Sequence, residues 1–345
     1  MKALTLTTTG GLEHLVLQDM PVPRPRAPDE VLVRLHAAAL NRLDLFVADG
    51  LPGVAPTFPL IMGADGAGMV EAVGPAVVGF DPGDRVLINP GLACGKCEWC
   101  VAGEQPLCPG FRILGEQIHG TMAEYVVVPA RNLALIPSQM TFAQAAAFPL
   151  ATLTAWRMLV TRAKLKPGET ILIWGIGGGV ALAALKIARL LGARTIVTSS
   201  ADWKLERARA LGADVTLNHA TTDVPREVRS LTERRGVNVV VDTAGAETWE
   251  RSLRSLGRGG RLVTCGATTG PMVITDVRKL FWYQWSLLGS TMGNDAEFRA
   301  VTALAARGEL WPEVDTVLPL DRVVEAYHRL ASGVQLGKVV IEVRA

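Results

Sequence analysis

The stretch that decides the fold runs from Ile171 to Leu191 and reads ILIWGIGGGVALAALKIARLL. An apolar run comes first, a glycine-rich turn follows, and the remainder favours a helix. Such a turn presents bare backbone N–H groups at a helix N-terminus, and glycine lets a phosphate approach without a Cβ clash. We therefore expect a dinucleotide site whose pyrophosphate lies on Gly175, Gly177, Gly178, Gly179 and Val180. The alternative is a turn that binds nothing.

Strands and helices continue to alternate after residue 166. The predicted strands are 170–174, 194–198, 215–217, 237–242, 261–265 and 286–289, with helical segments between most of them. Six strands joined by crossovers predict an α/β fold with a doubly wound parallel sheet of the Rossmann type. Helices at 296–307 and 321–330 follow, and a final strand at 338–343 is placed to return to the first domain.

The first third of the chain has a different pattern. Short runs that alternate apolar and polar residues, such as 31–35 and 84–88, are separated by turn-forming residues and indicate an all-β unit. Near Thr141 an alanine-rich helix begins at a capping box completed by Gln144. Pro149 is expected to kink or divide that helix.

Composition excludes several classes of protein. The 345 residues correspond to about two domains. Lys and Arg total 35 against 33 Asp and Glu, a net charge of +2 that argues against a nucleic-acid binder or a disordered chain. The N-terminus lacks the apolar run of a secretory signal, and four glycines and Lys186 interrupt the most apolar stretch, so we expect a cytoplasmic protein without a membrane span.

Four of the five cysteines fall within fifteen residues, at Cys94, Cys97, Cys100 and Cys108. Four thiolates complete a tetrahedral zinc shell with no open position, so the spacing predicts one structural Zn²⁺ per chain. An iron–sulfur cluster or no metal are the alternatives, although the last gap of seven residues is longer than in ferredoxin-like runs. Cys265 stands alone in an apolar run and is expected in the core.

The residues after the second strand of the glycine-loop domain bear on the choice of nucleotide. A carboxylate there would bind the ribose hydroxyls of NAD, but none ends this strand. The hydroxyls of Ser199 and Ser200 and the ammonium of Lys204 suit a 2′-phosphate instead, which favours NADPH. In the competing interpretation Asp202 caps the next helix and Lys204 is only solvated.

Together these segments resemble the medium-chain dehydrogenase/reductase superfamily over the whole chain. The resemblance rests on residues 37–44, 63–68, 70–74, 94–108, 153–155, 175–181 and 337–340, which occur in the family's order. It implies a GroES-like catalytic β domain made of residues 1–150 and 293–345, with the structural zinc lobe at 94–108, and a Rossmann domain at 151–292. In this family the sheet edge near 273–289 commonly pairs two subunits.

The departures from the family concern its catalytic metal. Zinc alcohol dehydrogenases of this family bind that metal through a cysteine, a histidine and a further cysteine or acidic residue, and the corresponding positions here resemble Asn41, Ala64 and Leu150. None is a usual zinc ligand. The chain is similar instead to the quinone oxidoreductase branch, which implies NADPH-dependent reduction of quinones or α,β-unsaturated carbonyls. Its structural zinc lobe sets it apart from many members of that branch.

The resemblance also implies positions for the site residues. Asn41 and Thr154 would contact the nicotinamide, and Lys338 would reach the diphosphate or the interdomain cleft. The remaining cofactor contacts would be Asp242, Gly266, Ala267, Gly289, Ser290 and Thr291. The alternatives are structural: Asn41 caps a turn, Thr154 bonds its own backbone, and Asp242 only ends a strand.

No tyrosine stands in the loop 48–57 to serve as a proton donor. Water would then supply the proton, or a carboxylate or imidazole would shuttle it, and the candidate side chains are Asp44, Asp65, Glu116 and His119. The same four residues are the candidates for an altered second metal site, or for simple turn contacts. Two rival functions therefore remain, an alcohol dehydrogenase with an unusual metal site and an NADPH-binding protein with little turnover.

Aromatic residues are dense near the sixth strand of the Rossmann sheet. Phe281, Trp282, Tyr283 and Trp285 suit a subunit interface, so we expect a homodimer or homotetramer. A hydrophobic wall of the active site is the competing explanation. The other expected partner is a small-molecule substrate.

Overall fold

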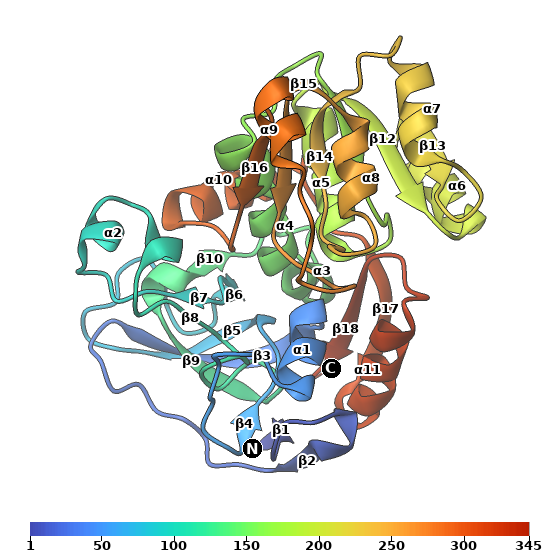
Figure 1. Cartoon of the computed structure of the whole chain (residues 1–345). Coiled ribbons are helices and arrows are strands. Elements are labelled where there is room, and N and C mark those ends of the chain that lie inside the picture. The colour runs from blue at the N-terminus through green and yellow to red at the C-terminus, as the bar shows by residue number, and fades with distance from the viewer. Residues whose placement is uncertain (345) are drawn as a thin grey trace. The chain divides into compact units, whose positions relative to one another are not determined.

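The structure is a computed structural model that describes residues 1–344. The chain divides into two compact units, one made of Met1–Ala151 together with the chain from Gly293 onward, the other of Thr152–Met292. Figure 1 shows the elements of both units. Among the described residues, no helix is both long and apolar enough to cross a membrane.

The second unit is built on a six-stranded parallel sheet, as the sequence predicts. Its strands run in the order β13-β12-β11-β14-β15-β16, which is the doubly wound Rossmann order. They are β11 (Thr170–Ile173), β12 (Arg194–Ser199), β13 (Val215–Asn218), β14 (Val237–Val241), β15 (Leu256–Thr264) and β16 (Ser286–Gly289). The central strand β11 is apolar and buried at Ile171, Leu172 and Ile173, because helices cover both faces of such a sheet.

Helices connect the strands of this sheet (Figure 1). They are α5 (Gly179–Leu190), α6 (Asp202–Ala210), α7 (Val224–Leu231), α8 (Trp249–Ser255) and α9 (Val277–Tyr283), preceded by a π-helical segment at Arg157–Arg162. Apolar residues from these helices and strands form one core, which includes Leu172, Val228, Val240 and Leu253.

One strand begins earlier than the sequence pattern indicates. β15 starts at Leu256, five residues before the predicted Arg261, and pairs with Val237 at that end. The sequence pattern does not predict this extension, because glycine has a low β propensity. A Cβ on Gly257 would come within 2.7 Å of the Arg235 carbonyl oxygen, so glycine is needed where the chains run this close.

The first unit is mostly β, and its main sheet joins both ends of the chain. Six strands run in the order β10-β6-β5-β3-β18-β17, and β9 also pairs with β3. They are β3 (Glu30–Ala39), β5 (Asp65–Val73), β6 (Arg85–Ile88), β9 (Tyr125–Pro129), β10 (Leu133–Leu135), β17 (Val314–Pro319) and β18 (Lys338–Glu342). Because β18 pairs antiparallel with β3, the last strand completes the sheet begun by the first third of the chain.

Smaller elements complete this unit. Its other strands are β1 (Lys2–Leu6), β2 (Leu15–Asp19), β4 (Leu60–Ile61), β7 (Gly91–Leu92) and β8 (Arg112–Ile113). Its helices are α1 (Arg42–Asp49), α2 (Glu98–Val101), α3 (Phe142–Ala147), α10 (Asp295–Ala306) and α11 (Val323–Ser332). Short 3-10 turns lie at Leu12–His14, Gln105–Leu107, Ala130–Asn132 and Leu320–Arg322.

The helix predicted near Thr141 forms as expected. Thr141 and Gln144 make the capping box that begins α3. The helix ends at Ala147, and α4 (Pro149–Trp156) starts afresh at the proline. Proline has no N–H and is tolerated at a first helical position, so Pro149 divides the segment into two helices.

Candidate active site and metal centre

The glycine loop connects β11 to α5 and is shaped for a close ligand. Gly175 has φ 69° and Gly177 has φ 140°, backbone conformations that L side chains rarely adopt. Thr198 at the end of β12 anchors the loop, because its hydroxyl accepts the Gly175 N–H at 3.2 Å and its carbonyl accepts the Ile176 N–H at 2.7 Å. A Cβ on Gly175 or Gly178 would meet no atom within 4 Å. These two glycines therefore face open space beside the α5 N-terminus, the arrangement in which a helix receives a phosphate.

The residues predicted to select the nucleotide are distributed over the end of β12 and the start of α6. Ser200 is exposed, whereas the buried Ser199 hydroxyl accepts the Ala201 N–H at 3.2 Å. Lys204 is buried, with its ammonium 5.4 Å from the Trp203 ring, so it is not merely solvated. Asp202 is not the N-cap, which is Ala201; it accepts an Asn218 amide N–H at 2.7 Å.

Asp242 has a structural role within its own unit. Its side chain is fully buried at the end of β14. The carboxylate accepts N–H groups of Ala244 and Gly245 and hydroxyls of Thr248 and Ser252. With both oxygens bound inside the unit, Asp242 holds the turn that leads into α8, and its predicted contact with the cofactor stays a prediction.

The other predicted cofactor residues lie after the carboxyl ends of β15 and β16, the edge at which ligands bind in such sheets. Gly266 and Ala267 follow β15 and are half-buried. Gly289 ends β16, and a Cβ there would meet nothing within 4 Å. The Ser290 hydroxyl is buried without a hydrogen-bond partner in residues 1–344, and Thr291 is exposed.

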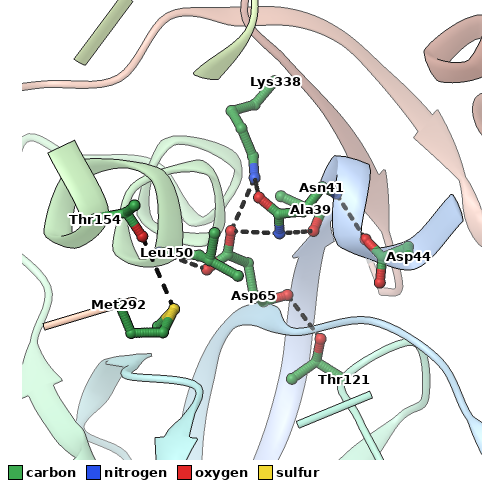
Figure 2. A network of polar contacts seen from close by, with 9 residues as sticks. All are labelled: Ala39, Asn41, Asp44, Asp65, Thr121, Leu150, Thr154, Met292 and Lys338. Atoms are coloured by element: carbon green, nitrogen blue, oxygen red, sulfur yellow. Dashed lines mark hydrogen bonds and ion pairs between the residues drawn. The ribbon is translucent and has the colours of Figure 1, made fainter. Parts of the chain in front are cut away.

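Thr154 lies on α4 and is buried. Its hydroxyl is 3.9 Å from the Met292 sulfur, so it points toward the segment that follows β16 (Figure 2). This contact joins the start of the second unit to its end.

The four clustered cysteines converge in space. Their sulfur atoms all lie within 4.8 Å of one another, and Cys100 Sγ is 3.5 Å from Cys97 Sγ and 3.9 Å from Cys94 Sγ. A tetrahedral zinc with bonds of about 2.3 Å separates its sulfur ligands by roughly 3.8 Å. Backbone N–H groups of Lys96 and Cys97 lower the pKa of the Cys94 thiol to about 6, which favours the thiolate. The donor set and spacing therefore fit a structural zinc site.

Asn41, Asp65 and Lys338 form a buried polar network in the first unit (Figure 2). The Lys338 ammonium donates to Asn41 Oδ1 in a short contact and to Asp65 Oδ2 at 2.8 Å. Asn41 Nδ2 donates to the same Asp65 oxygen at 2.9 Å. The Leu150 backbone N–H donates to Asp65 Oδ1 at 2.8 Å. Both printed partners of Lys338 lie in this unit, and its predicted contact with the cofactor diphosphate or the interdomain cleft stays a prediction.

Sheet topology brings these three side chains together. Antiparallel pairing places Ala39, at the end of β3, opposite both Asp65 at the start of β5 and Val340 of β18. Asn41 follows β3 and Lys338 begins β18, so the network forms where three adjacent strands end or start. Gly337 has φ 110°, and a Cβ there would lie 2.5 Å from the Glu313 carbonyl oxygen. Glycine at this position lets the backbone present Lys338 to Asp65.

Asp44 lies beside the network at the first turn of α1. It accepts the Asn41 backbone N–H at 2.6 Å, so Asn41 both caps the helix and binds Lys338. Complete burial raises the pKa of Asp44 to about 7, although the Asn41 N–H and the Lys338 charge act in the opposite direction. The nearby Tyr327 is also buried, and its hydroxyl has no partner in the described part of the chain.

Glu116 and His119 do not join Asp44 and Asp65. His119 Nδ1 accepts the Ile61 N–H at 3.2 Å, and Glu116 accepts a Gln117 amide N–H at 2.8 Å. Within residues 1–344, the cysteine cluster is the single group of three or more His, Cys, Asp or Glu side chains placed to share a metal. In the part of the chain that the structure describes, these four side chains therefore do not come together as a shared metal site.

Sequence reasoning did not find the Asp65–Lys338 ion pair, because the partners are 273 residues apart. One signal was available. Lys338 begins a strand whose next three residues, Val339, Val340 and Ile341, are apolar and fully buried. A lysine that opens such a strand requires a partner, since a buried charge is costly unless paired.

Comparisons with known proteins agree with this architecture. The model described as "Alcohol dehydrogenase GroES-like domain" matches residues 27–138, and the one described as "Zinc-binding dehydrogenase" matches residues 179–307. A solved structure titled as an NAD-dependent alcohol dehydrogenase is 46% identical, covers 100% of both chains and superposes with a TM-score of 0.96.

Two further relatives carry similar names. An alcohol dehydrogenase of Geobacillus stearothermophilus is 34% identical and covers 95% of this chain and 96% of its own. A cobalt- and zinc-bound thermostable alcohol dehydrogenase from Pyrobaculum aerophilum is 37% identical over 99% of each chain, with a TM-score of 0.89. The chain thus belongs to the zinc-containing alcohol dehydrogenase-like family of the medium-chain dehydrogenase/reductase superfamily and is an oxidoreductase of that type.

Proposed function

We propose that this protein is an NADPH-dependent reductase of quinones or α,β-unsaturated carbonyl compounds that works without a catalytic metal. The proposal is carried by one observation: the residues at the family's metal-ligand positions are not metal ligands in this chain. An amide (Asn41), a methyl group (Ala64) and an isobutyl group (Leu150) stand there, and the polar atoms nearby are bound to Asp65 and Lys338. This donor set does not fit Zn²⁺, which favours thiolate, imidazole and carboxylate ligands.

The chemistry required of the chain is modest. The reduced nicotinamide, when bound, supplies the hydride, so that the cofactor is oxidised by two electrons and the acceptor takes a proton from water. A conjugated acceptor spreads the developing negative charge onto its oxygen and needs less assistance than an unactivated alcohol. The chain's residues orient the cofactor through the glycine loop and the carboxyl ends of β14, β15 and β16.

The preference for NADPH rests on the end of β12. No carboxylate closes this strand, and Ser200 is exposed directly after it. Asp202 is hydrogen-bonded to Asn218, which supports the turn instead of a ribose hydroxyl. NADH is the competing cofactor, because one relative is titled an NAD-dependent alcohol dehydrogenase. The ratio of kcat/KM for NADPH and NADH decides between the two cofactors.

The test of this function follows NADPH oxidation with an ortho-quinone, a linear enal and an enoyl thioester, using saturated aldehydes as controls. We expect turnover of conjugated acceptors that survives removal of loosely bound metal by a chelator. Reduction of saturated aldehydes alone, abolished by the chelator, would instead support the alcohol dehydrogenase that the names of the relatives suggest. Tight NADPH binding without turnover of any acceptor would support a binding protein.

We also propose that two copies of the chain associate through the edge of the Rossmann sheet. β16 is the last strand of that sheet. Beside it, Ile274, Phe281 and Trp282 are 92%, 65% and 65% exposed, an apolar patch that suits a second copy. Tyr283 and Trp285 instead stack on each other within the unit. Light scattering should give at least twice the 36.8 kDa chain mass, and a monomer would rule out this assembly.

All five cysteines are free thiols, which suits a reducing compartment and supports the cytoplasmic location that we propose.

A further inference from the structure

His219 directly follows β13 and contacts the strand end that anchors the glycine loop. Its Nδ1 lies 3.1 Å from the hydroxyl of Thr198, the same hydroxyl that accepts the Gly175 N–H at 3.2 Å. All three residues belong to the second unit. One side chain therefore separates His219 from the loop on which we expect the cofactor pyrophosphate.

The Thr198 hydroxyl needs an acceptor for its own proton. Thr198 is fully buried, so that acceptor must come from the protein. Among the described residues it is His219 Nδ1, because the hydroxyl oxygen already receives the Gly175 N–H. A neutral imidazole with its proton on Nε2 fits this arrangement. Burial and the nearby charge of Arg251 lower the pKa of His219, which favours the neutral form.

The His219 ring is held in place by its backbone and by Trp174. The His219 N–H donates to the Ser199 carbonyl at 3.0 Å, and the His219 carbonyl accepts an Arg251 N–H at 3.1 Å. The ring centres of His219 and Trp174 are 5.9 Å apart, and the Arg251 guanidinium lies 4.8 Å from the Trp174 ring centre. Because Trp174 is buried, it offers the imidazole a closely packed surface. These contacts keep Nδ1 within reach of the strand-end hydroxyl.

We propose that His219 is a positioning residue for the dinucleotide, because it accepts the Thr198 hydroxyl proton and so orients the oxygen that holds Gly175. The loop then presents its backbone N–H groups to the pyrophosphate in one arrangement, and this preorganisation raises affinity. The inference rests on the nicotinamide cofactor of the proposed function. It applies equally to NADPH and NADH, since both carry the pyrophosphate.

The binding test removes the acceptor and keeps the ring. His219→Phe is compared with His219→Asn, whose side-chain oxygen lies as many bonds from Cβ as Nδ1 does. Nicotinamide fluorescence gives the Kd values for NADPH and NADH. We expect His219→Phe to raise both Kd values about tenfold, the scale of one hydrogen bond, and to leave kcat at saturating cofactor within about threefold. His219→Asn should restore both Kd values to within about threefold of the wild type, because its amide oxygen accepts the hydroxyl proton.

A double-variant cycle tests whether the effect passes through Thr198. Thr198→Val should raise the Kd values at least as much as His219→Phe does. His219→Phe/Thr198→Val should match Thr198→Val, because without the hydroxyl His219 has nothing to orient. The matched control is Thr195→Val near the opposite end of β12, where another fully buried hydroxyl donates to Asp214 at 2.7 Å. This control should lower stability and leave both Kd values unchanged.

A second measurement needs no cofactor. Hydrogen exchange of the ligand-free protein is followed by mass spectrometry in peptides that contain Gly175 and Ile176. We expect faster exchange in His219→Phe and Thr198→Val than in Thr195→Val, because the loop N–H groups lose their fixed acceptor.

The outcomes separate this inference from the proposed function. Unchanged Kd values in His219→Phe would overturn the inference, and so would an equal rise in Thr195→Val, which would indicate a general loss of stability. If the wild type binds neither dinucleotide, both proposals fail. If the variants behave as expected but the wild type reduces no conjugated acceptor, the role of His219 is supported and the proposed function fails.

Discussion

The cysteine lobe gathers four sulfur atoms within 4.8 Å of one another, whereas the network at Asn41 joins one carboxylate and one ammonium 2.8 Å apart. Both lie in the first unit. Four thiolates repel one another, and a doubly charged ion offsets that repulsion better than any side chain. A single buried carboxylate needs only one positive charge, which a lysine supplies.

Under the proposed function, the fold keeps one metal site of the family and works without the other. The lobe depends on its metal for its structure, because its ligands come from a short segment with few strands of its own. The Asn41 network lies at the ends of β3, β5 and β18, whose sheet is stable without a metal. Under the proposed function, the absence of a metal there changes the chemistry of the site and leaves the fold intact.

The largest effect is expected from breaking the lobe. Cys100→Ser removes one of two buried thiolates, and structural zinc sites contribute on the order of 10 kcal/mol to the segments they organise. Mass spectrometry should find no zinc in this variant, and limited proteolysis should cut within residues 94–108. Cys265→Ser, outside the cluster, should retain one zinc and resist cleavage. Zinc retained by Cys100→Ser would refute the four-thiolate site.

Next in size is the loss of the buried ammonium. Lys338→Met leaves Asp65 unpaired in the core and should lower the free energy of unfolding by about 3–5 kcal/mol. Lys2 and Asp19 form an ion pair of the same 2.8 Å length, but their side chains are 57% and 71% exposed. Lys2→Met should therefore cost less than about 1 kcal/mol. Urea denaturation of both variants measures the contrast, which equal costs would refute.

A smaller effect concerns the pH dependence contributed by Asp44. Burial raises its pKa from 3.8 to about 7, with Lys338, Asp65 and Tyr327 as its charged or titratable neighbours. The folded state thus favours the protonated acid, and this contribution to stability is lost as pH rises from about 4 to 7.

Asp44→Asn does not titrate and should remove that loss. Relative to the wild type it should gain stability between pH 4 and pH 7, by at most about 4 kcal/mol at roughly 1.4 kcal/mol for each pKa unit. Urea midpoints across this range measure the gain. Parallel pH curves for the two proteins would show that Asp44 is ionised throughout.

The features that the sequence predicts well are local. The glycine loop, the six strands of the Rossmann sheet and the capping box at Thr141 each depend on a few consecutive residues, and the structure contains them. The start of β15 was missed because Gly257 and its neighbours are chosen for close backbone packing, which contradicts strand propensity.

The contacts among the candidate site residues were harder to predict from the sequence. Spacing alone points to the cysteine cluster, but Asp65 and Lys338 meet only because β5, β3 and β18 are adjacent in one sheet. The surroundings of Asp242 also depend on the fold. Its position at a strand end suggests a ligand contact, yet Thr248 and Ser252 lie close enough to bind both of its oxygens.

The count of tightly bound zinc most directly tests the proposal that this chain has a structural zinc and no catalytic metal. The purified wild type is incubated with excess zinc, desalted and analysed by elemental mass spectrometry against protein concentration. One zinc per chain, lost in Cys100→Ser, is the predicted result. Two zinc ions per chain, with one retained in Cys100→Ser, would contradict the account and show a second metal site outside the cysteine lobe.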